Sequence, residues 1–319
     1  KFNESVLKVE NTVSNNDLSA TIDDINLEDY RLKDGSVFII RQENIYILTK
    51  NIKWGDIEGI TPTSSYIILP EGFTFTGQGY TIDFEDIYIS GLFKVECNNS
   101  NNIPYIVDLK LVNVNSNRYS GILVRSNCKY VDVNNCSIEN ATVGMDSGGI
   151  TGRNCGENGV IKVRNCFCIF ELINMHSGGI VGGHSNRSSS LKNDILIENC
   201  YLKCNYTNGN YTSGIIGGSM QGNITLNNCY CVLNRDSGSG SGMLAGPSMC
   251  YTYGVLHIKN CYAIMVLSLV LHASCFRSSS RRRRRKGGGL RLTAAARAAV
   301  VYQIIVVFPS CVVLPHIPR

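Results

Sequence analysis

The 319-residue sequence predicts an all-β fold: a parallel β-solenoid that forms one elongated domain. Three observations predict it. Between residues 130 and 262 an Asn-Cys pair recurs every 29 to 34 residues, each copy follows two apolar residues at alternate positions, and each precedes a glycine-containing segment that leads into Ile or Met. A unit this short cannot bury its apolar side alone, so we expect neighbouring units to stack.

The alternating segments predict one half-buried strand in each unit. The asparagines of the five Asn-Cys pairs fix the register: Asn135, Asn165, Asn199, Asn228 and Asn260. Two residues before each of them stand Val133, Val163, Ile197, Leu226 and Ile258. The positions on either side of this row are mostly polar, as in a strand with one buried face. We therefore expect these five apolar side chains to form one continuous interior row.

The glycine-containing halves predict short strands and corners. Gly149-Ile150 and the segment 179–183 place apolar residues between glycines, which leaves too few residues for a helix. Asparagine suits the corner before the cysteine, because it tolerates left-handed backbone and can hydrogen-bond from coil to coil. A coil of three strands and three turns needs about 20 to 25 residues, so each longer unit is expected to carry one extended loop.

The chain outside the repeats divides into three parts. Residues 1–34 are polar and are predicted to be an N-terminal extension or cap, which would cover the open end of the solenoid. Residues 35–264 form the predicted β-helix, with irregular first coils. Residues 265–319 lack Asp, Glu and Asn and are predicted to lie outside the fold.

Three origins are open for this tail. Arg, Lys and Gly can all be written with purine-only codons, which favours a stretch translated in a shifted reading frame. A basic segment for a membrane surface or nucleic acid is the second reading. A true membrane anchor is the third, although the apolar run 298–308 is shorter than the roughly 20 residues of a spanning helix. Membrane contact is therefore expected only if the tail is genuine.

The repeat also resembles a known family. Gly-Gly-Ile-Val-Gly at residues 178–182, followed by Ile-x-Asn-Cys-Tyr at residues 197–201, is similar to the GLUG-type repeat. Proteins of this kind are right-handed parallel β-helices of bacterial surfaces and large DNA viruses, and the resemblance covers residues 67–262. It implies a surface, fibre or adhesion role more often than catalysis, and it supplies no catalytic residues.

The charge is distributed unevenly. Ten of the 30 Lys and Arg lie after residue 264, where no Asp or Glu occurs, so residues 1–264 hold 20 basic and 25 acidic side chains and carry a net charge of −5. Phosphate binding depends on clustered cations. We therefore expect no nucleic-acid binding by residues 1–264.

Fourteen cysteines raise the question of disulfides or a metal site. Five of them follow the corner asparagines and should form a column about 4.8 Å apart: Cys136, Cys166, Cys200, Cys229 and Cys261. Parallel Cβ vectors disfavour disulfides, and the Cys-x-Cys spacings lack the two-residue spacer of structural zinc sites. Buried thiols are the favoured interpretation, and no metal is expected.

Catalysis has one local candidate, Asp83 with Glu85. Two residues apart on a strand, they would lie on one side at roughly 7 Å, within the range of an inverting glycosidase pair. A solvated outer face is the plainer interpretation, because neighbouring units offer no column of acids. His176 and His184 flank a glycine turn and are expected to be loop residues. No phosphate loop or catalytic triad signature occurs, so no cofactor is expected.

Aromatic residues give the stronger binding candidate. Directly after four of the repeated cysteines stand Phe167, Tyr201, Tyr230 and Tyr262. If the cysteines point inward, these rings point outward and form a ladder that could contact sugars or a partner protein. If the corner breaks the alternation, the rings belong to the core instead.

These observations favour a non-catalytic surface, fibre or adhesion module that binds glycan or protein through one face or its loops. The alternative is a polysaccharide-degrading enzyme, either a hydrolase or a lyase. A surface-exposed or virion-associated location is favoured, although no signal segment is visible at Lys1. Homo-oligomerisation stays open, because β-helices of fibres are often trimers.

Overall fold

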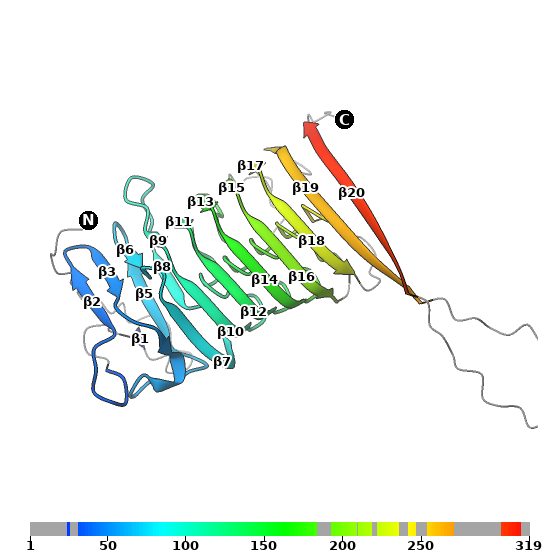
Figure 1. Cartoon of the computed structure of the whole chain (residues 1–319). Helices are drawn as coiled ribbons and strands as arrows, with labels where there is room; N and C mark the ends of the chain where they lie inside the picture. The colour runs from blue at the N-terminus through cyan, green and yellow to red at the C-terminus, as the bar shows by residue number, and fades with distance from the viewer. Residues whose placement is uncertain are drawn as a thin grey trace, which may run out of the picture.

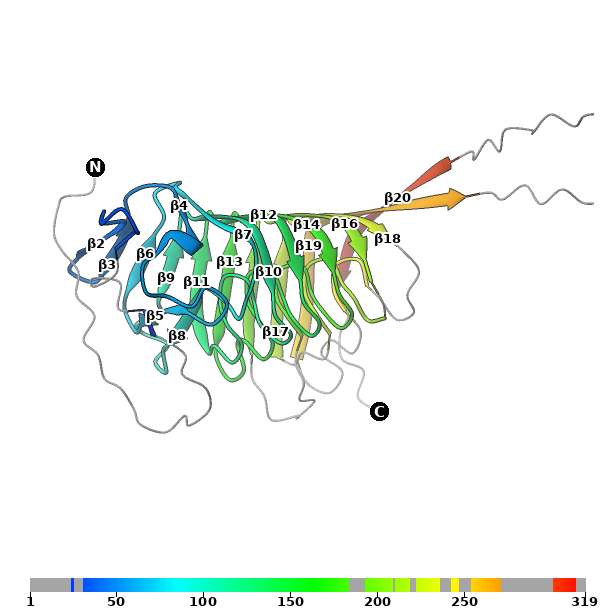
Figure 2. The ribbon, with the colours of Figure 1, turned by 90° about the horizontal axis from the view of Figure 1, so that it is seen from below.

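Short parallel strands stack along one axis and build the faces of a β-solenoid (Figure 1, Figure 2). The structure, a computed structural model, describes residues 24–25, 31–183, 193–208, 210–218, 222–235, 242–246, 254–270 and 301–313. Within these residues the one helical element is the single 3-10 turn η1 (Trp54–Asp56). The predicted all-β parallel solenoid is confirmed.

Two long sheets run the length of the solenoid. Sheet one stacks β3 (Ile45–Leu48), β6 (Thr74–Thr76), β9 (Tyr105–Val107), β11 (Tyr130–Asn134), β13 (Val160–Arg164), β15 (Asp194–Glu198), β17 (Gly222–Asn227) and β19 (Gly254–Val270). Sheet two stacks β4 (Ile52–Lys53), β7 (Thr81–Ile89), β10 (Lys110–Ser116), β12 (Ser137–Val143), β14 (Phe167–Ile173), β16 (Tyr201–Thr207) and β18 (Tyr230–Arg235), and β19 continues into it.

A third, shorter face closes each coil. It begins as sheet three, formed by β1 (Asp24–Ile25), β5 (Tyr66–Pro70) and β8 (Phe93–Glu96). Single parallel bridges then continue it through Val124, Thr151, Val181 and Ile216. A second row of bridges, three residues earlier in each coil, joins Gly121 to Gly148, Gly178 to Ser213 and Ser213 to Gly242. The glycine-containing segments predicted from the sequence form this third face, with these bridged positions in place of a full strand.

Two further strands pair in the antiparallel direction. β2 (Ile39–Gln42) forms a hairpin with β3 at the first coil, and β20 (Val301–Val313) pairs with β19 at the last. In the part of the chain that the structure describes, no helix is long and apolar enough to cross a membrane. The predicted cap falls largely on residues outside the described ranges, and the division of the chain at residues 34 and 264 stays a prediction.

The predicted interior row exists. Sheet one pairs Val133 with Val163, Val163 with Ile197, Ile197 with Leu226, and Leu226 with Ile258. The first four side chains have no exposed surface, and Ile258 at the end packs against the same core. Burial of aliphatic side chains along this row joins the coils, because each one covers the row of its neighbours.

The corner between sheets one and two is made by asparagine, as predicted. Asn135, Asn165, Asn199 and Asn228 have φ between 52° and 53°, in the left-handed region that asparagine tolerates better than most residues. Asn199 Nδ2 donates to Asn165 Oδ1 at 3.1 Å, and Asn228 Nδ2 donates to Asn199 Oδ1 at 2.7 Å. We call this column the asparagine ladder.

The cysteines are buried thiols. The eleven cysteines whose side chains the structure describes are all free and buried, including the predicted column from Cys136 to Cys261. Their Sγ atoms contact main-chain carbonyls; that of Cys166, for example, donates to Arg164 O at 3.2 Å. Burial raises the pKa of Cys155 to about 12 and that of Cys204 to about 12, because a thiolate would lose its hydration there. The interpretation as buried thiols is confirmed for these residues.

Large aromatic side chains fill the first coils in place of the small thiols. Trp54 packs against Phe84 with ring centroids 5.2 Å apart, and Phe75 packs edge-on against Phe93 at 4.8 Å. The indole nitrogen of Trp54 donates to Pro62 O at 3.0 Å, so its polar atom is satisfied in the core. The irregular first coils therefore continue into the repeats as one core.

Candidate functional site

Four aromatic residues lie in one column on the outer surface of sheet two. The register pairs Phe167 with Tyr201, Tyr201 with Tyr230, and Tyr230 with Tyr262. The ring centroids of Phe167 and Tyr201 lie 5.0 Å apart at an interplanar angle of 12°, and those of Tyr201 and Tyr230 lie 5.4 Å apart at 32°. The rings therefore point outward in one column, which we call the aromatic ladder.

The ends of the aromatic ladder are more open than its middle. Phe167 is 38% exposed and Tyr262 is 49% exposed, whereas Tyr201 and Tyr230 are half-buried. Burial also raises the pKa of Tyr201, so its hydroxyl stays a neutral donor over the physiological range. In the preceding coil the residue paired with Phe167 is the small Ser137, so one face of the Phe167 ring has no aromatic neighbour in the column.

Apolar side chains flank the aromatic ladder on the same surface. Two residues further along their strands, Ile169, Val232 and Ile264 also point outward and are half-buried, with Lys203 between the first two in the register. Alternation along a strand places all of them on the face opposite the core. Sheet two thus presents a flat strip of aromatic and aliphatic side chains with one cation.

Asp83 and Glu85 lie at the other end of sheet two. Asp83 Oδ1 accepts from the Glu85 amide and from Asn113 Nδ2, both at 2.9 Å. Asp83 and Glu85 both face outward, with the buried Phe84 between them, and Glu85 Oε1 lies 2.5 Å from Lys53 Nζ. Both carboxylates therefore have structural partners in the neighbouring coils. Their catalytic role stays a prediction.

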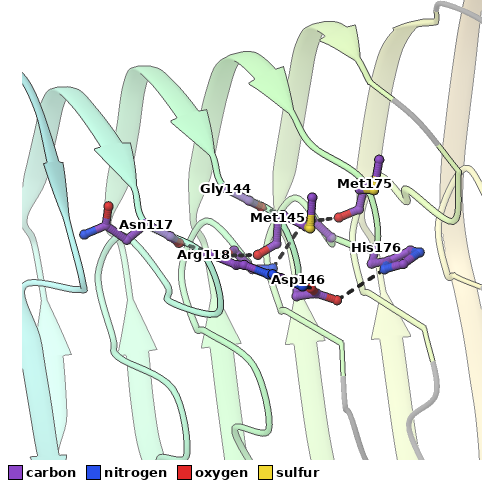
Figure 3. A network of polar contacts seen from close by, with 9 residues as sticks. Asn117, Arg118, Gly144, Met145, Asp146, Met175 and His176 are labelled. Atoms are coloured by element: carbon purple, nitrogen blue, oxygen red, sulfur yellow. Dashed lines mark hydrogen bonds and ion pairs between the residues drawn. The ribbon is translucent and has the colours of Figure 1, made fainter.

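A second cluster lies at the corner between sheet two and the third face (Figure 3). Asp146 is at its centre: its Oδ2 lies 3.3 Å from Arg118 Nη2, and its Oδ1 lies 3.3 Å from His176 Nδ1. The His176 ring lies 5.3 Å from that of Tyr211 in the next coil.

Tyr119, next to Arg118 in the chain, adds two further contacts to this cluster. The guanidinium carbon of Arg118 lies 4.4 Å from the Tyr119 ring centroid, and that of Arg153 lies 4.5 Å from it. The six side chains form a continuous chain of contacts, which we call the corner network: Arg153, Tyr119, Arg118, Asp146, His176 and Tyr211.

The corner network arises from one repeated backbone position. Tyr119, Asp146, His176 and Tyr211 each stand two residues before a bridged residue of the third face, and their φ values are 71°, 56°, 61° and 60°. Buried serines support this corner: the Ser147 amide donates to Ser177 Oγ at 3.1 Å, and Ser177 Oγ donates to Gly144 O at 2.7 Å. The fold therefore projects these four side chains from successive coils.

Sequence reasoning missed the corner network. It treated His176 as a scattered loop residue, and His184 lies outside the described residues. The signal was the Ser-Gly pair that directly follows Tyr119, Asp146 and His176; Tyr211 is followed by Thr-Ser-Gly instead. Within the described part of the chain, no group of three or more His, Cys, Asp or Glu side chains is placed to hold a metal ion.

Known proteins add little to this geometry. No protein-family profile matches the chain, and no curated protein matches it. Among solved structures the chain is similar to a crystal structure described as a "putative immunoglobulin A1 protease from Bacteroides ovatus", with 21% identity over 70% of each chain and a TM-score of 0.45. A likeness at this level supports no argument about activity. What stands is the fold, a parallel β-solenoid that carries an aromatic ladder and a corner network.

Proposed function

We propose that the chain is a non-catalytic binding module of a surface, fibre or adhesion protein, and that it contacts its partner through the outer face of sheet two. The observation that supports this most directly is the aromatic ladder from Phe167 to Tyr262, which leaves aromatic and aliphatic surface exposed. Exposed apolar surface of this kind typically marks a binding surface.

The stacking favours a protein surface over a sugar as the partner. Both faces of Tyr201 are covered by the neighbouring rings at 5.0 and 5.4 Å, so no sugar ring can stack on it. The strip offers ring edges, tyrosine hydroxyls and flanking aliphatic side chains instead, a composition typical of protein interfaces. Stacking of a sugar is then left to the other three rings, of which Phe167 and Tyr262 are the most exposed.

The polysaccharide-degrading alternative has less support. An acid–base pair needs two carboxylates that face one substrate bond. Asp132 is held by Arg164 at 2.7 Å, and Glu198 Oε1 accepts from Asn227 Nδ2 at 3.1 Å. Glu85 is held by Lys53, so these acids serve contacts between neighbouring coils.

The test compares two outward substitutions on the full chain. Tyr201→Ser interrupts the aromatic ladder, and Leu196→Ser removes a half-buried outward side chain from sheet one as the matched control. Sedimentation velocity measures whether the chain self-associates, with a second copy of the chain as the protein partner. A glycan array is scored for binding and for cleavage.

We expect an interaction that Tyr201→Ser abolishes and Leu196→Ser preserves. Cleaved glycan products would instead establish the enzyme. Equal binding by both variants, or no interaction in either assay, would overturn the proposal.

A further inference from the structure

We propose that the corner network is a binding site for a carboxylate-bearing oligosaccharide, separate from the aromatic ladder. The network lies on a different edge of the coils, between sheet two and the third face, where Figure 3 shows Arg118, Asp146 and His176. With Tyr211 it spans four successive coils. The inference goes beyond the proposed function because it assigns a second site and a ligand chemistry. It does not require the aromatic ladder to bind anything.

The anion-binding part consists of two arginines on one tyrosine ring. The guanidinium carbons of Arg118 and Arg153 lie 4.4 and 4.5 Å from the Tyr119 ring centroid, so they are within about 9 Å of each other. Stacking uses the flat face of a guanidinium group and leaves the N–H donors at its edge available. The ring therefore holds two planar donor groups in fixed positions.

The two arginines differ in their partners. Arg118 Nε and Nη2 contact Asp146 Oδ2 at 3.4 and 3.3 Å. Arg153 is half-buried and has no ion pair with any residue that the structure describes. Acids outnumber bases in residues 1–264, so an arginine without an acidic partner is not explained by a surplus of cations. A ligand carboxylate matches its planar, bidentate donor geometry.

The remaining part of the network suits hydroxyl groups. His176 Nδ1 faces Asp146, which fixes the ring and turns Nε2 to the other side. The side chain of His176 is 45% exposed, and so is Tyr211. Successive coils present these polar groups about 4.8 Å apart. A chain of sugar units with a carboxylate at one position can use each of them, whereas an apolar peptide would leave them unpaired.

The backbone supports a functional reading of this corner. The asparagine ladder shows which residue the solenoid uses where a left-handed corner serves only structure. At the corner network the same conformation is taken by the bulky Tyr119 and Tyr211, which tolerate a positive φ less well than asparagine does. Strained backbone positions of this kind cluster at functional sites, where the need for a particular side chain outweighs the energetic cost of the conformation.

The experiment measures binding by calorimetry on the full chain. The probes are uronate- and sialate-containing tri- and tetrasaccharides, each with a neutral counterpart of the same length. Arg153→Gln removes the unpaired donor, Arg118→Gln removes its neighbour, and Lys162→Gln removes a half-buried cation from sheet one as the matched control. Thermal unfolding shows whether each variant is folded.

We expect the acidic oligosaccharides to bind and the neutral ones to bind more weakly. Arg153→Gln should weaken acidic binding about tenfold or more, since a charge-assisted contact is lost, and Lys162→Gln should leave it unchanged. Equal binding of acidic and neutral probes, unchanged binding by folded Arg153→Gln, or no binding of any acidic probe would overturn the inference. If Arg153→Gln does not fold, the binding of acidic and neutral probes by Arg118→Gln tests the inference in the same way. A failure of the Tyr201→Ser test would leave this result standing.

Discussion

Sheets one and two share a core but differ on their outer surfaces. On sheet one the outward residues satisfy one another: Arg164 Nη2 contacts both oxygens of Asp132 at 2.7 and 2.8 Å, and Asn134 Nδ2 donates to the Tyr105 hydroxyl at 2.8 Å. On sheet two the equivalent positions carry the aromatic ladder and its aliphatic neighbours. At these positions sheet one carries polar contacts between coils, whereas sheet two leaves aromatic surface exposed.

The difference implies that the interior residues determine stability and that the outer residues of sheet two determine binding. The interior rows and the thiols lie between the sheets and hold both of them, whereas the outer residues of either sheet touch only the adjacent coils. Changes in the interior should therefore unfold both sheets together. Changes on the outside should leave the fold intact and, on sheet two alone, remove a binding surface.

Alkaline pH should cause the largest loss of stability, because it acts on many interior thiols at once. Folding raises the pKa of Cys155 and Cys204 from 9.0 to about 12 through burial. Their contribution to the free energy of unfolding is thus fully present below about pH 9 and is lost as the pH rises toward 12. Urea unfolding followed by circular dichroism from pH 8 to 11.5 measures it.

Alkylation with iodoacetamide at pH 8 provides the control for that prediction. The buried thiols should react slowly in the folded chain and rapidly in urea, because the thiolate is the reactive form. Rapid alkylation of the folded chain would contradict the placement of these cysteines in the interior.

Ile197→Ala should have the next largest effect. Ile197 is fully buried in the interior row, and its truncation leaves a cavity that costs about 2–5 kcal/mol. The adjacent outward substitution Leu196→Ala serves as the control and should cost much less. Equal losses in chemical denaturation would mean that sheet one does not have the described inner and outer faces.

Asn199→Ala should cost about 2–4 kcal/mol. Alanine loses the contacts with Asn165 and Asn228 and must also adopt the φ of 52°. Asn199→Gly loses the same contacts but accepts this φ without strain, so it should cost about half as much. If glycine destabilises as much as alanine, the corner conformation does not contribute.

Asp132→Asn should have the smallest effect, about 1 kcal/mol or less. The ion pair with Arg164 is partly exposed, and pairs of this kind contribute little because water screens them. The thermal midpoint in low and high salt measures it. A loss of stability comparable to that of Ile197→Ala would show that the outer contacts of sheet one also stabilise the fold, contrary to the expected difference between interior and outer residues.

Most of the fold can be predicted from the sequence, because the repeat conserves the type of residue at each position as well as the spacing. Val163 and Ile197 lie at alternate positions, and asparagine before cysteine is suited both to the left-handed corner and to the stacked contacts. The aromatic ladder follows from the same register. These features need only the knowledge that successive units stack.

The remaining features depend on backbone details that periodicity does not contain. The sequence places Asp83 and Glu85 on one side of a strand, but it does not show the left-handed conformation of Glu85 and Asp86 that follows there. The corner network repeats a conformation without repeating a side chain, since Tyr119, Asp146 and His176 have no common chemistry. The Ser-Gly pair after each of them is a sequence signal for their equivalence, but their side-chain contacts are evident only in the structure.

The asparagine ladder has an electrical consequence. The amides of Asn165, Asn199 and Asn228 each donate toward the preceding coil, so their dipoles point the same way along the solenoid axis and add together. At the N-terminal end of the row, Asn135 Nδ2 donates to the carboxylate of Asp108 at 2.6 Å. A negative charge thus sits at the positive pole of the aligned amides, as an acidic residue does at the start of an α-helix.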